Sequence, residues 1–269
     1  MPVAPWHLSK TRRPLIRRRF TGMHPTRQSS EDLVWMRRAL DLARKMRGHV
    51  WPNPPVGCVI VKDGTLVAGA ATQPGGRPHA ERKALDAAGT AARGATLYVT
   101  LEPCCHWGRT PPCADAIIEA GLSRVVASIR DPDPRVNGGG FARLREAGIA
   151  VSVGACADEA ENLMSGFFNR IRLGVPEVIV STGPSDELPS GTDALITSSE
   201  RGVQLLARHA QLNVSDTDPN RLLARLGELG LTSVAVPQDD PLTVIFADAR
   251  TKAAVDAVPQ SNLQTPTRL

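Results

Sequence analysis

The sequence predicts an α/β protein whose sheet is covered by helices on both faces. Short runs rich in Val, Ile and Leu alternate along the chain with segments whose apolar residues recur at helical spacing, the order expected of βαβ units. Turns rich in Gly and Pro separate these runs. A length of 269 residues, of which 42% are hydrophobic and 22% charged, suffices for one large domain or two smaller ones.

Caps and turns predict the first elements. A helix is expected to begin after Ser29, since a serine cap with an acid three residues later satisfies the first free amides, and Gly48 ends its apolar periodicity. The rigid proline-rich turn 52–57 precedes a β-hairpin, and an Ala-rich helix follows. The expected bounds are strands at 58–61 and 66–71 and a helix at 79–88.

Strands and helices alternate in the next part of the chain. One helix follows the proline pair 111–112 and runs to Ala120, and another follows the glycines 138–140 and ends near Gly148. The expected strands are 95–101, 124–129 and 149–153. Sheets of this kind hold their sites at the carboxyl ends of strands, and Cys104 follows such an end.

The net charge of +5 originates at the start of the chain. Residues 1–28 hold seven Lys and Arg and no acid, so residues 29–269 carry −2, which does not indicate a polyanionic partner. We expect residues 1–28 to form a disordered basic arm. Three interpretations of it stay open: a lead ahead of a true initiator at Met23, an organelle-targeting peptide, or a nucleic-acid-binding arm.

The cysteines favour metal binding over disulfides. Five cysteines at irregular spacing do not make a disulfide framework, which indicates a reducing, cytoplasmic setting. No apolar run approaches the ~18 residues that would span a bilayer, so no membrane partner is expected.

Four positions carry the predicted chemistry. His79, Cys104 and Cys113 offer one imidazole and two thiolates, a ligand set that suits a tetrahedral Zn²⁺ with one position left for water. Glu81 lies two residues after the histidine, and His-x-Glu followed by Pro-Cys and a second Cys is the signature of zinc-dependent base deaminases. One Zn²⁺ per chain is expected. The alternative is a structural zinc site closed by a fourth ligand, for which Cys105 is the adjacent candidate.

The expected reaction is hydrolytic loss of an exocyclic amine. Zinc activates a water for attack on an amidine-like carbon, and Glu81 moves protons from the water to the ring nitrogen and the departing ammonia. Burial beside an apolar helix is expected to raise the pKa of Glu81 toward that role.

Several stretches resemble the pyrimidine deaminase of riboflavin biosynthesis. The diagnostic one is Glu-Pro-Cys-Cys-His-Trp-Gly-Arg-Thr-Pro-Pro-Cys at 102–113, where eight residues separate Cys104 from Cys113. The resemblance extends over about residues 30–175 and includes Pro-Asn-Pro-Pro-Val-Gly at 52–57, Pro-His-Ala-Glu at 78–81 and Asp-Pro-Asp-Pro at 131–134. It implies a cytidine-deaminase-like three-layer α/β/α sandwich, acting on a pyrimidine ribotide, 2,5-diamino-6-ribosylamino-4(3H)-pyrimidinone 5′-phosphate.

The resemblance also implies substrate contacts. In this interpretation Asn53 holds the pyrimidine, while Arg109 and His106 line the ribose-phosphate side, since a guanidinium fork can bind two phosphate oxygens. Alternatively, Asn53 is a structural turn residue, Arg109 a solvated charge and His106 a packing residue. Some family members carry a histidine shortly before the His-Ala-Glu, where this chain has Thr72.

The C-terminal part departs from the family pattern. The family often fuses a reductase that uses NADPH, and 175–180 and 230–236 resemble two of its strands, with a strand–helix pattern at 202–209 and 222–229 between them. The stretches that follow the two resembling strands, 181–186 and 237–240, lack the family's cofactor-binding residues.

We therefore expect residues 29–174 to form a deaminase domain and 175–269 a shortened, reductase-like α/β remnant with a disordered tail. NADP binding is not expected, and deletion of 177–269 is expected to leave the deaminase rate largely intact.

Two other functions were weighed against this one. A nucleobase or nucleic-acid deaminase is disfavoured by the cysteine spacing, the acidic body and only ten aromatic residues for stacking bases. A catalytically inactive zinc scaffold that binds a protein partner would have no need for Glu81. The expected partners are therefore the small-molecule ribotide and water, without nucleic acid, and a homo-oligomer stays open as an alternative to a monomer.

Overall fold

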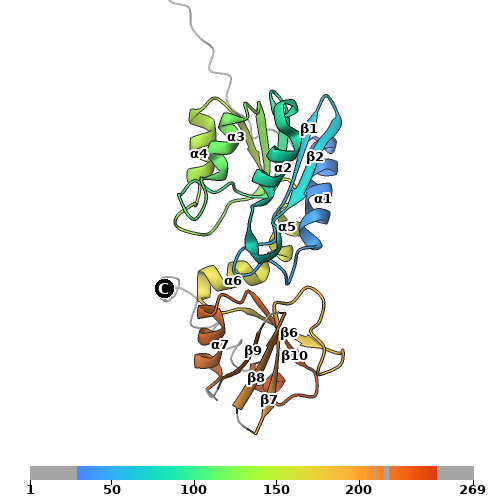
Figure 1. The fold of residues 1–269 in the computed structure, drawn as a ribbon, viewed down its shortest axis with the longest axis vertical. Coiled ribbons are helices and arrows are strands. Elements are labelled where there is room, and N and C mark those ends of the chain that lie inside the picture. The colour runs from blue at the N-terminus through green and yellow to red at the C-terminus, as the bar shows by residue number, and fades with distance from the viewer. Residues whose placement is uncertain (1–28, 201, 209, 215–217, 247–269) are drawn as a thin grey trace, which may run out of the picture.

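The computed structural model describes residues 29–200, 202–208, 210–214 and 218–246. Figure 1 shows two lobes, each built on its own five-stranded sheet, with the N-terminal lobe in blue to yellow and the C-terminal lobe mostly in orange. The expectations for the basic arm 1–28 and for the tail of the chain lie outside the described residues.

The sheet of the N-terminal lobe has the strand order β2-β1-β3-β4-β5. β1 pairs antiparallel with both β2 and β3, whereas β3, β4 and β5 run parallel. The two-residue turn at Asp63 and Gly64, both with positive φ, closes the predicted hairpin. The strands are β1 (Gly57–Lys62), β2 (Thr65–Ala71), β3 (Thr96–Leu101), β4 (Arg124–Ile129) and β5 (Ala150–Val153).

Helices cover both faces of this sheet. α1 and α5 contact each other and pack on one face, while α2, α3 and α4 form a connected layer on the other (Figure 1). The predicted three-layer α/β/α sandwich is confirmed, and α5 was not predicted. The helices are α1 (Ser30–Arg44), α2 (Ala80–Ala88), α3 (Cys113–Glu119), α4 (Gly139–Glu146) and α5 (Ala157–Leu163).

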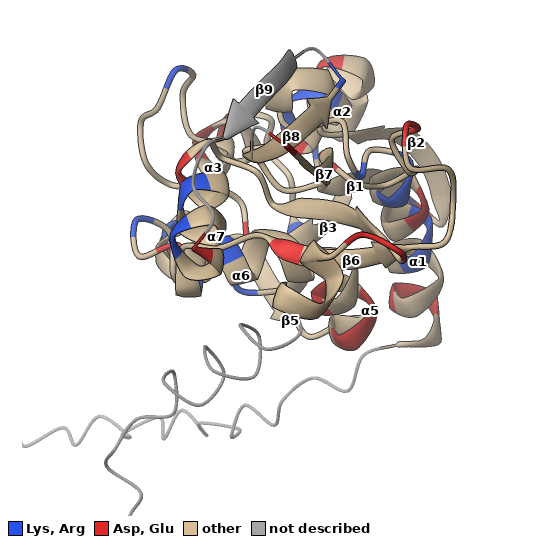
Figure 2. Ribbon diagram, turned by 90° about the horizontal axis from the view of Figure 1, so that it is seen from below, with Lys and Arg blue, Asp and Glu red and all other residues tan. Residues whose placement is uncertain are grey.

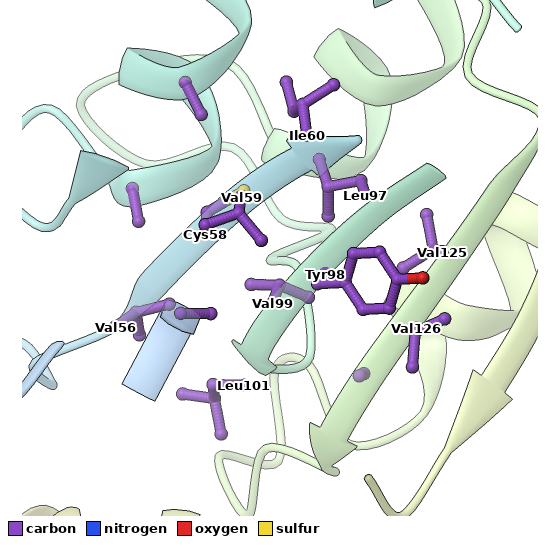
Figure 3. Close-up of a cluster of buried hydrophobic side chains, with 14 of the residues drawn as sticks. Val56, Cys58, Val59, Ile60, Leu97, Tyr98, Val99, Leu101, Val125 and Val126 are labelled. Atoms are coloured by element: carbon purple, nitrogen blue, oxygen red, sulfur yellow. The ribbon is translucent and has the colours of Figure 1, made fainter. Parts of the chain in front are cut away.

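The central strands are buried on both sides because helices cover both faces. Figure 3 shows their side chains in the core, where Cys58, Ile60, Leu97 and Val125 are fully buried. The prediction that Cys58 is a core residue is confirmed. Continuous apolar runs of this kind are typical of strands that are covered on both faces.

A buried polar cluster attaches the start of α1 to the sheet. Ser29 and Asp32 form the predicted capping box, and both carboxylate oxygens of Asp32 also accept hydrogen bonds from Arg124 on β4, at 2.7 and 2.9 Å. The hydroxyl of Tyr98 on β3 donates to the same carboxylate at 3.1 Å. Asp32 is therefore buried with all of its charge compensated.

The C-terminal lobe is also α/β. Its sheet has the order β6-β10-β7-β8-β9, with β6, β10 and β7 parallel and β7, β8 and β9 antiparallel. Strands β6, β8 and β10 and helix α7 fall within the predicted pattern; β7 and β9 were not predicted. The elements are β6 (Glu177–Ser181), β7 (Ala194–Ser199), β8 (Gly202–Ala207), β9 (Ala210–Val214), α7 (Pro219–Glu228) and β10 (Ser233–Pro237).

Helix α6 (Ser165–Leu173) lies between the two sheets (Figure 1). Its Phe167 and Phe168 belong to the N-terminal core, while the backbone at Gly166 approaches Thr232 of the C-terminal lobe closely. Within the described ranges, no helix combines the length and apolarity needed to cross a bilayer.

Candidate active site

Three elements bring the predicted metal ligands together. His79 caps the N-terminus of α2, Cys104 follows the carboxyl end of β3, and Cys113 is the first residue of α3. Their ligand atoms all lie within 4.8 Å of one another, and the His79 Nδ1 atom is 3.7 Å from Cys104 Sγ and 3.4 Å from Cys113 Sγ. The sequence prediction that these three side chains converge is thus met by the geometry.

The protonation of the two thiols fits a metal site. Hydrogen bonds from Cys113, through its thiol and its backbone N–H at 3.3 Å, together with His79, lower the pKa of Cys104 to about 4. The pKa of Cys113 is raised, mainly by its hydrogen bond to Cys104 and by burial. A ready thiolate beside a second thiol and an imidazole is a donor set that suits Zn²⁺.

Cys105 does not join this cluster. Its sulfur lies 3.6 Å from the carbonyl oxygen of Arg135, on the side of the loop that faces α4. The described residues therefore offer three protein ligands, which leaves a position for water as in catalytic zinc sites.

Glu81 lies in the first turn of α2 with only 4% of its surface exposed. Burial raises the pKa of this carboxyl group to about 7, and the Cys104 thiolate adds to the rise while His79 opposes it. The predicted rise is confirmed, and a carboxyl group that titrates near neutral pH can both accept and deliver a proton.

A pocket of about 580 Å³ opens beside this cluster. His79, Glu81 and Cys104 line it. The three residues predicted to contact a substrate also line it: Asn53 from the proline-rich turn, and His106 and Arg109 from the loop after Cys104. Trp107 of the same loop lines the pocket and is 72% exposed.

Thr72, which stands where some family members have histidine, is also in the wall of the pocket. It is buried, and its hydroxyl accepts a hydrogen bond from Val56 N–H at 3.1 Å and lies 3.2 Å from the Pro54 carbonyl oxygen. Thr72 therefore supports the turn that carries Asn53.

Sequence reasoning missed six pocket residues that carry charge or bulk. Asp131 and Asp133 stand in a motif that was noted for family resemblance alone, whereas the others have no motif and reach the pocket through tertiary structure. These residues are Arg77, Asp131, Asp133, Arg135, Phe167 and Arg170.

The loop that carries Asp131 and Asp133 is held by Glu102. This buried carboxylate accepts hydrogen bonds from the backbone N–H groups of Asp131, Gly138 and Phe141, at 3.3, 2.9 and 3.1 Å. Burial raises the pKa of Asp131 to about 6. Glu102 thus fixes one wall of the pocket two residues before the ligand Cys104.

A second hollow, of about 640 Å³, lies at the carboxyl ends of β6 and β10. The two stretches that depart from the family pattern, after 180 and after 236, meet here. Asp240 accepts hydrogen bonds from the Ser198 N–H and hydroxyl at 2.8 and 3.0 Å, so its carboxylate is committed to holding the end of β7.

Fold and site together place the chain in the cytidine-deaminase-like class. The family described as the cytidine and deoxycytidylate deaminase zinc-binding region matches residues 29–129. Comparison with individual proteins identifies the family within this class. Over 145 residues the chain is 44% identical to the diaminohydroxyphosphoribosylamino-pyrimidine deaminase of Buchnera aphidicola subsp. Acyrthosiphon pisum, covering 54% of this chain and 99% of that protein. The chain belongs to this deaminase family of riboflavin biosynthesis.

Longer relatives share the C-terminal lobe in part. The riboflavin biosynthesis protein RibD of Escherichia coli is 45% identical over 248 residues, which cover 89% of this chain and 62% of that protein. The crystal structure of a deaminase/reductase from Thermotoga maritima is 29% identical, with a TM-score of 0.68 over 81% of this chain and 84% of that one. The chain thus spans about three fifths of the length of the E. coli relative.

Proposed function

We propose that the chain catalyses the zinc-dependent hydrolytic deamination of 2,5-diamino-6-ribosylamino-4(3H)-pyrimidinone 5′-phosphate, with release of ammonia. The observation that carries the proposal is one pocket in which a His, Cys, Cys cluster lies beside a buried carboxyl group with a pKa of about 7. The name of the Buchnera relative gives the substrate class.

His79, Cys104 and Cys113 would hold one zinc ion, which when bound supplies Lewis-acid activation of a water molecule at neutral pH. Glu81 accepts a proton from the attacking water and delivers it to the ring nitrogen beside the carbon under attack. Glu81 then takes the proton of the hydroxyl that has been added to the carbon and delivers it to the exocyclic amine, which leaves as ammonia while the hydroxyl becomes a carbonyl. One C–O bond forms and one C–N bond breaks, and Glu81 ends in its starting state.

The substrate is oriented by the rest of the pocket. Asn53, on the proline-rich turn, offers a donor and an acceptor to the edge of the pyrimidine. Arg109 and His106 line the loop side of the pocket, where the ribose phosphate would extend. The side-chain Nδ1 atom of His106 is buried without a partner among the described residues, which leaves it available to a ligand.

We propose that residues 29–174 are the deaminase domain, and that 175–269 are a shortened remnant of the family's reductase that does not bind NADP. Asp239 and Asp240 in the second hollow support this proposal, since carboxylates repel a pyrophosphate. A cytoplasmic location agrees with five free cysteines. Acidic residues on α5 and charges of both signs on α1 and α7 (Figure 2) agree with a small-molecule substrate rather than a nucleic acid.

The deciding experiment measures ammonia release from the diamino-pyrimidinone phosphate, with cytidine and single-stranded DNA as competing substrates. Glu81→Gln keeps the shape of the side chain but cannot shuttle a proton, so turnover should fall by about 10²–10⁴ with zinc content unchanged. NADPH added to the same assay should not be oxidised. A Glu81→Gln protein with near-normal turnover would refute the mechanism, and preference for cytidine or DNA would refute the substrate.

A further inference from the structure

Four arginines line the candidate pocket, and two of them bond to polar side chains of the protein. Arg135 forms an ion pair with Asp133, with Nε 3.0 Å from one carboxylate oxygen and 3.1 Å from the other. Arg77 donates from Nη1 to the Thr110 hydroxyl at 2.7 Å. Arg109, the residue expected from the sequence to meet a phosphate, lies exposed on the loop.

Arg170 differs from these three. It extends from α6 into the pocket, and its Nη2 donates to the Pro52 carbonyl oxygen at 3.4 Å. Its Nε atom is buried and has no acceptor in the described part of the chain, and no carboxylate there forms an ion pair with it. Burial, followed by repulsion from Arg135, lowers the pKa of this guanidinium. A partly buried cation with an unused donor is costly unless an anion completes it.

We propose that Arg170 binds the phosphate group of the substrate. The charges in the pocket are divided in a way that favours this orientation. Glu81 and Asp131 lie close to Cys104 and the cluster, where they repel a phosphate and leave room for an uncharged heterocycle. Arg170 supplies a positive charge that no carboxylate of the described residues holds in an ion pair, and its free Nε is buried. A guanidinium can bind two phosphate oxygens at once.

This proposal rests on the proposed function for the identity of the substrate and names a residue that the motifs of the family resemblance do not contain. The helix α6 lies outside the zinc-binding region that matches residues 29–129. Only tertiary folding therefore brings Arg170 to the pocket, through the packing of Phe167 and Phe168 in the N-terminal core.

The test compares substrate with and without its phosphate. In Arg170→Met, kcat/KM for the phosphorylated substrate should fall about ten- to hundredfold, mainly through KM, whereas kcat/KM for the dephosphorylated riboside should stay within about twofold of wild type. The matched control is Arg172→Met on the same helix, since Arg172 is exposed and pairs with Glu161. Equal losses for both substrates would overturn the proposal and assign Arg170 to supporting Pro52; no loss for either would also overturn it.

A second measurement does not depend on deamination. Ribose 5-phosphate, but not ribose, should raise the melting temperature of the wild-type protein, and this gain should be lost in Arg170→Met and partly restored in Arg170→Lys. If the wild type shows the gain but releases no ammonia, the anion site stands and the proposed function fails. If ribose 5-phosphate stabilises Arg170→Met as much as wild type, or fails to stabilise the wild type, the proposal fails.

Discussion

At the scale of single residues, the neighbouring cysteines Cys104 and Cys105 have different surroundings, and only Cys104 belongs to the candidate metal cluster. The Cys104 sulfur faces His79 and Cys113, whereas the Cys105 sulfur faces the backbone of the loop before α4. Both residues lie beyond the end of the strand β3, and their side chains point to different sides of the loop. Metal binding at this site therefore depends on which of the two sulfurs points toward α2.

Cys104→Ser is accordingly expected to lose bound zinc and, because metal binding is linked to folding, to unfold at a lower temperature. Cys105→Ser should keep one zinc per chain and the wild-type melting temperature. Metal analysis of the two purified variants by plasma emission, together with thermal unfolding, checks both expectations. Loss of zinc in Cys105→Ser with retention in Cys104→Ser would reverse the ligand assignment.

The sequence was sufficient for residues whose chemistry is rare and insufficient for residues whose chemistry is common. A His, two Cys and a Glu in this order have few other uses, so the convergence of His79, Cys104 and Cys113 could be predicted without coordinates. An arginine on a helix is ordinary, and the pocket position of Arg170 arises only when α6 packs between the lobes. Arg109 lines the pocket as predicted, but Arg170 is the pocket arginine whose buried Nε atom has no acceptor in the described part of the chain.

At the scale of elements, the first helix and the sheet are joined by one carboxylate. Asp32 is 3% exposed, accepts two hydrogen bonds from Arg124 and one from Tyr98, and completes the cap of α1. The hydrogen bonds to Arg124 are the main reason why the pKa of Asp32 is lowered from 3.8 to about 2. The stability of the folded state therefore depends on the ionisation of Asp32, and so on pH.

Because the pKa of Asp32 is lower in the folded state, the stabilisation is fully present above pH ~4 and is lost as pH falls through about 2. The shift corresponds to roughly 2 kcal/mol of unfolding free energy. Asp32→Asn should lower the unfolding free energy at neutral pH by about that amount and flatten its decline between pH 4 and 2. Urea unfolding at a series of pH values measures this.

The control for Asp32 lies on the same helix. Asp41 is exposed and pairs with Arg44 on the surface, where such pairs contribute little. Asp41→Asn should leave both the free energy of unfolding and its pH dependence nearly unchanged. Equal pH profiles for wild type and Asp32→Asn would show that the buried pair does not control acid stability.

Helices and strands were predicted accurately where caps, turns and apolar periodicity agree. The prediction was incomplete where tertiary contacts determine the local structure. The caps and apolar periods of 29–153 gave strands and helices within a few residues of those observed. Strands β7 and β9 have short sequences of mixed apolar and polar residues, which do not predict a strand. Each pairs through its backbone with β8. Helices α5 and α6 are stabilised by the packing of Leu163, Phe167 and Phe168 in the N-terminal core.

At the scale of the whole molecule, one short segment belongs to both lobes. Trp51 packs against the C-terminal core, while Asn53, two residues later, lines the deaminase pocket. The C-terminal lobe also contacts the segment at Gly48, whose carbonyl oxygen accepts a hydrogen bond from Arg208 Nε at 3.0 Å, and a Cβ at Gly230 would come within 2.9 Å of Pro52. The segment that carries Asn53 is thus attached to both lobes.

This arrangement argues against the expectation that residues 177–269 can be removed without effect on deamination. The Buchnera relative, matched over 99% of its length by about half of this chain, carries a deaminase name without a second lobe of this kind in the match. In the present chain, however, the segment that carries Asn53 has its apolar anchor in the C-terminal core. We therefore expect the lobe to support substrate binding even without a reaction of its own.

Trp51→Ala tests this coupling between the lobes. Removal of the half-buried indole should lower the unfolding free energy by about 1–3 kcal/mol, less than for a fully buried Trp, and the freed segment should raise KM several-fold with zinc content unchanged. Trp35→Ala is the matched control, since Trp35 is also half-buried but packs on α1 against the N-terminal core. That variant should lose stability without a change in KM, as measured by ammonia release at increasing substrate concentration. If Trp51→Ala and Trp35→Ala keep the same KM as wild type, the pocket does not depend on the second lobe, and the C-terminal lobe would be dispensable as first expected.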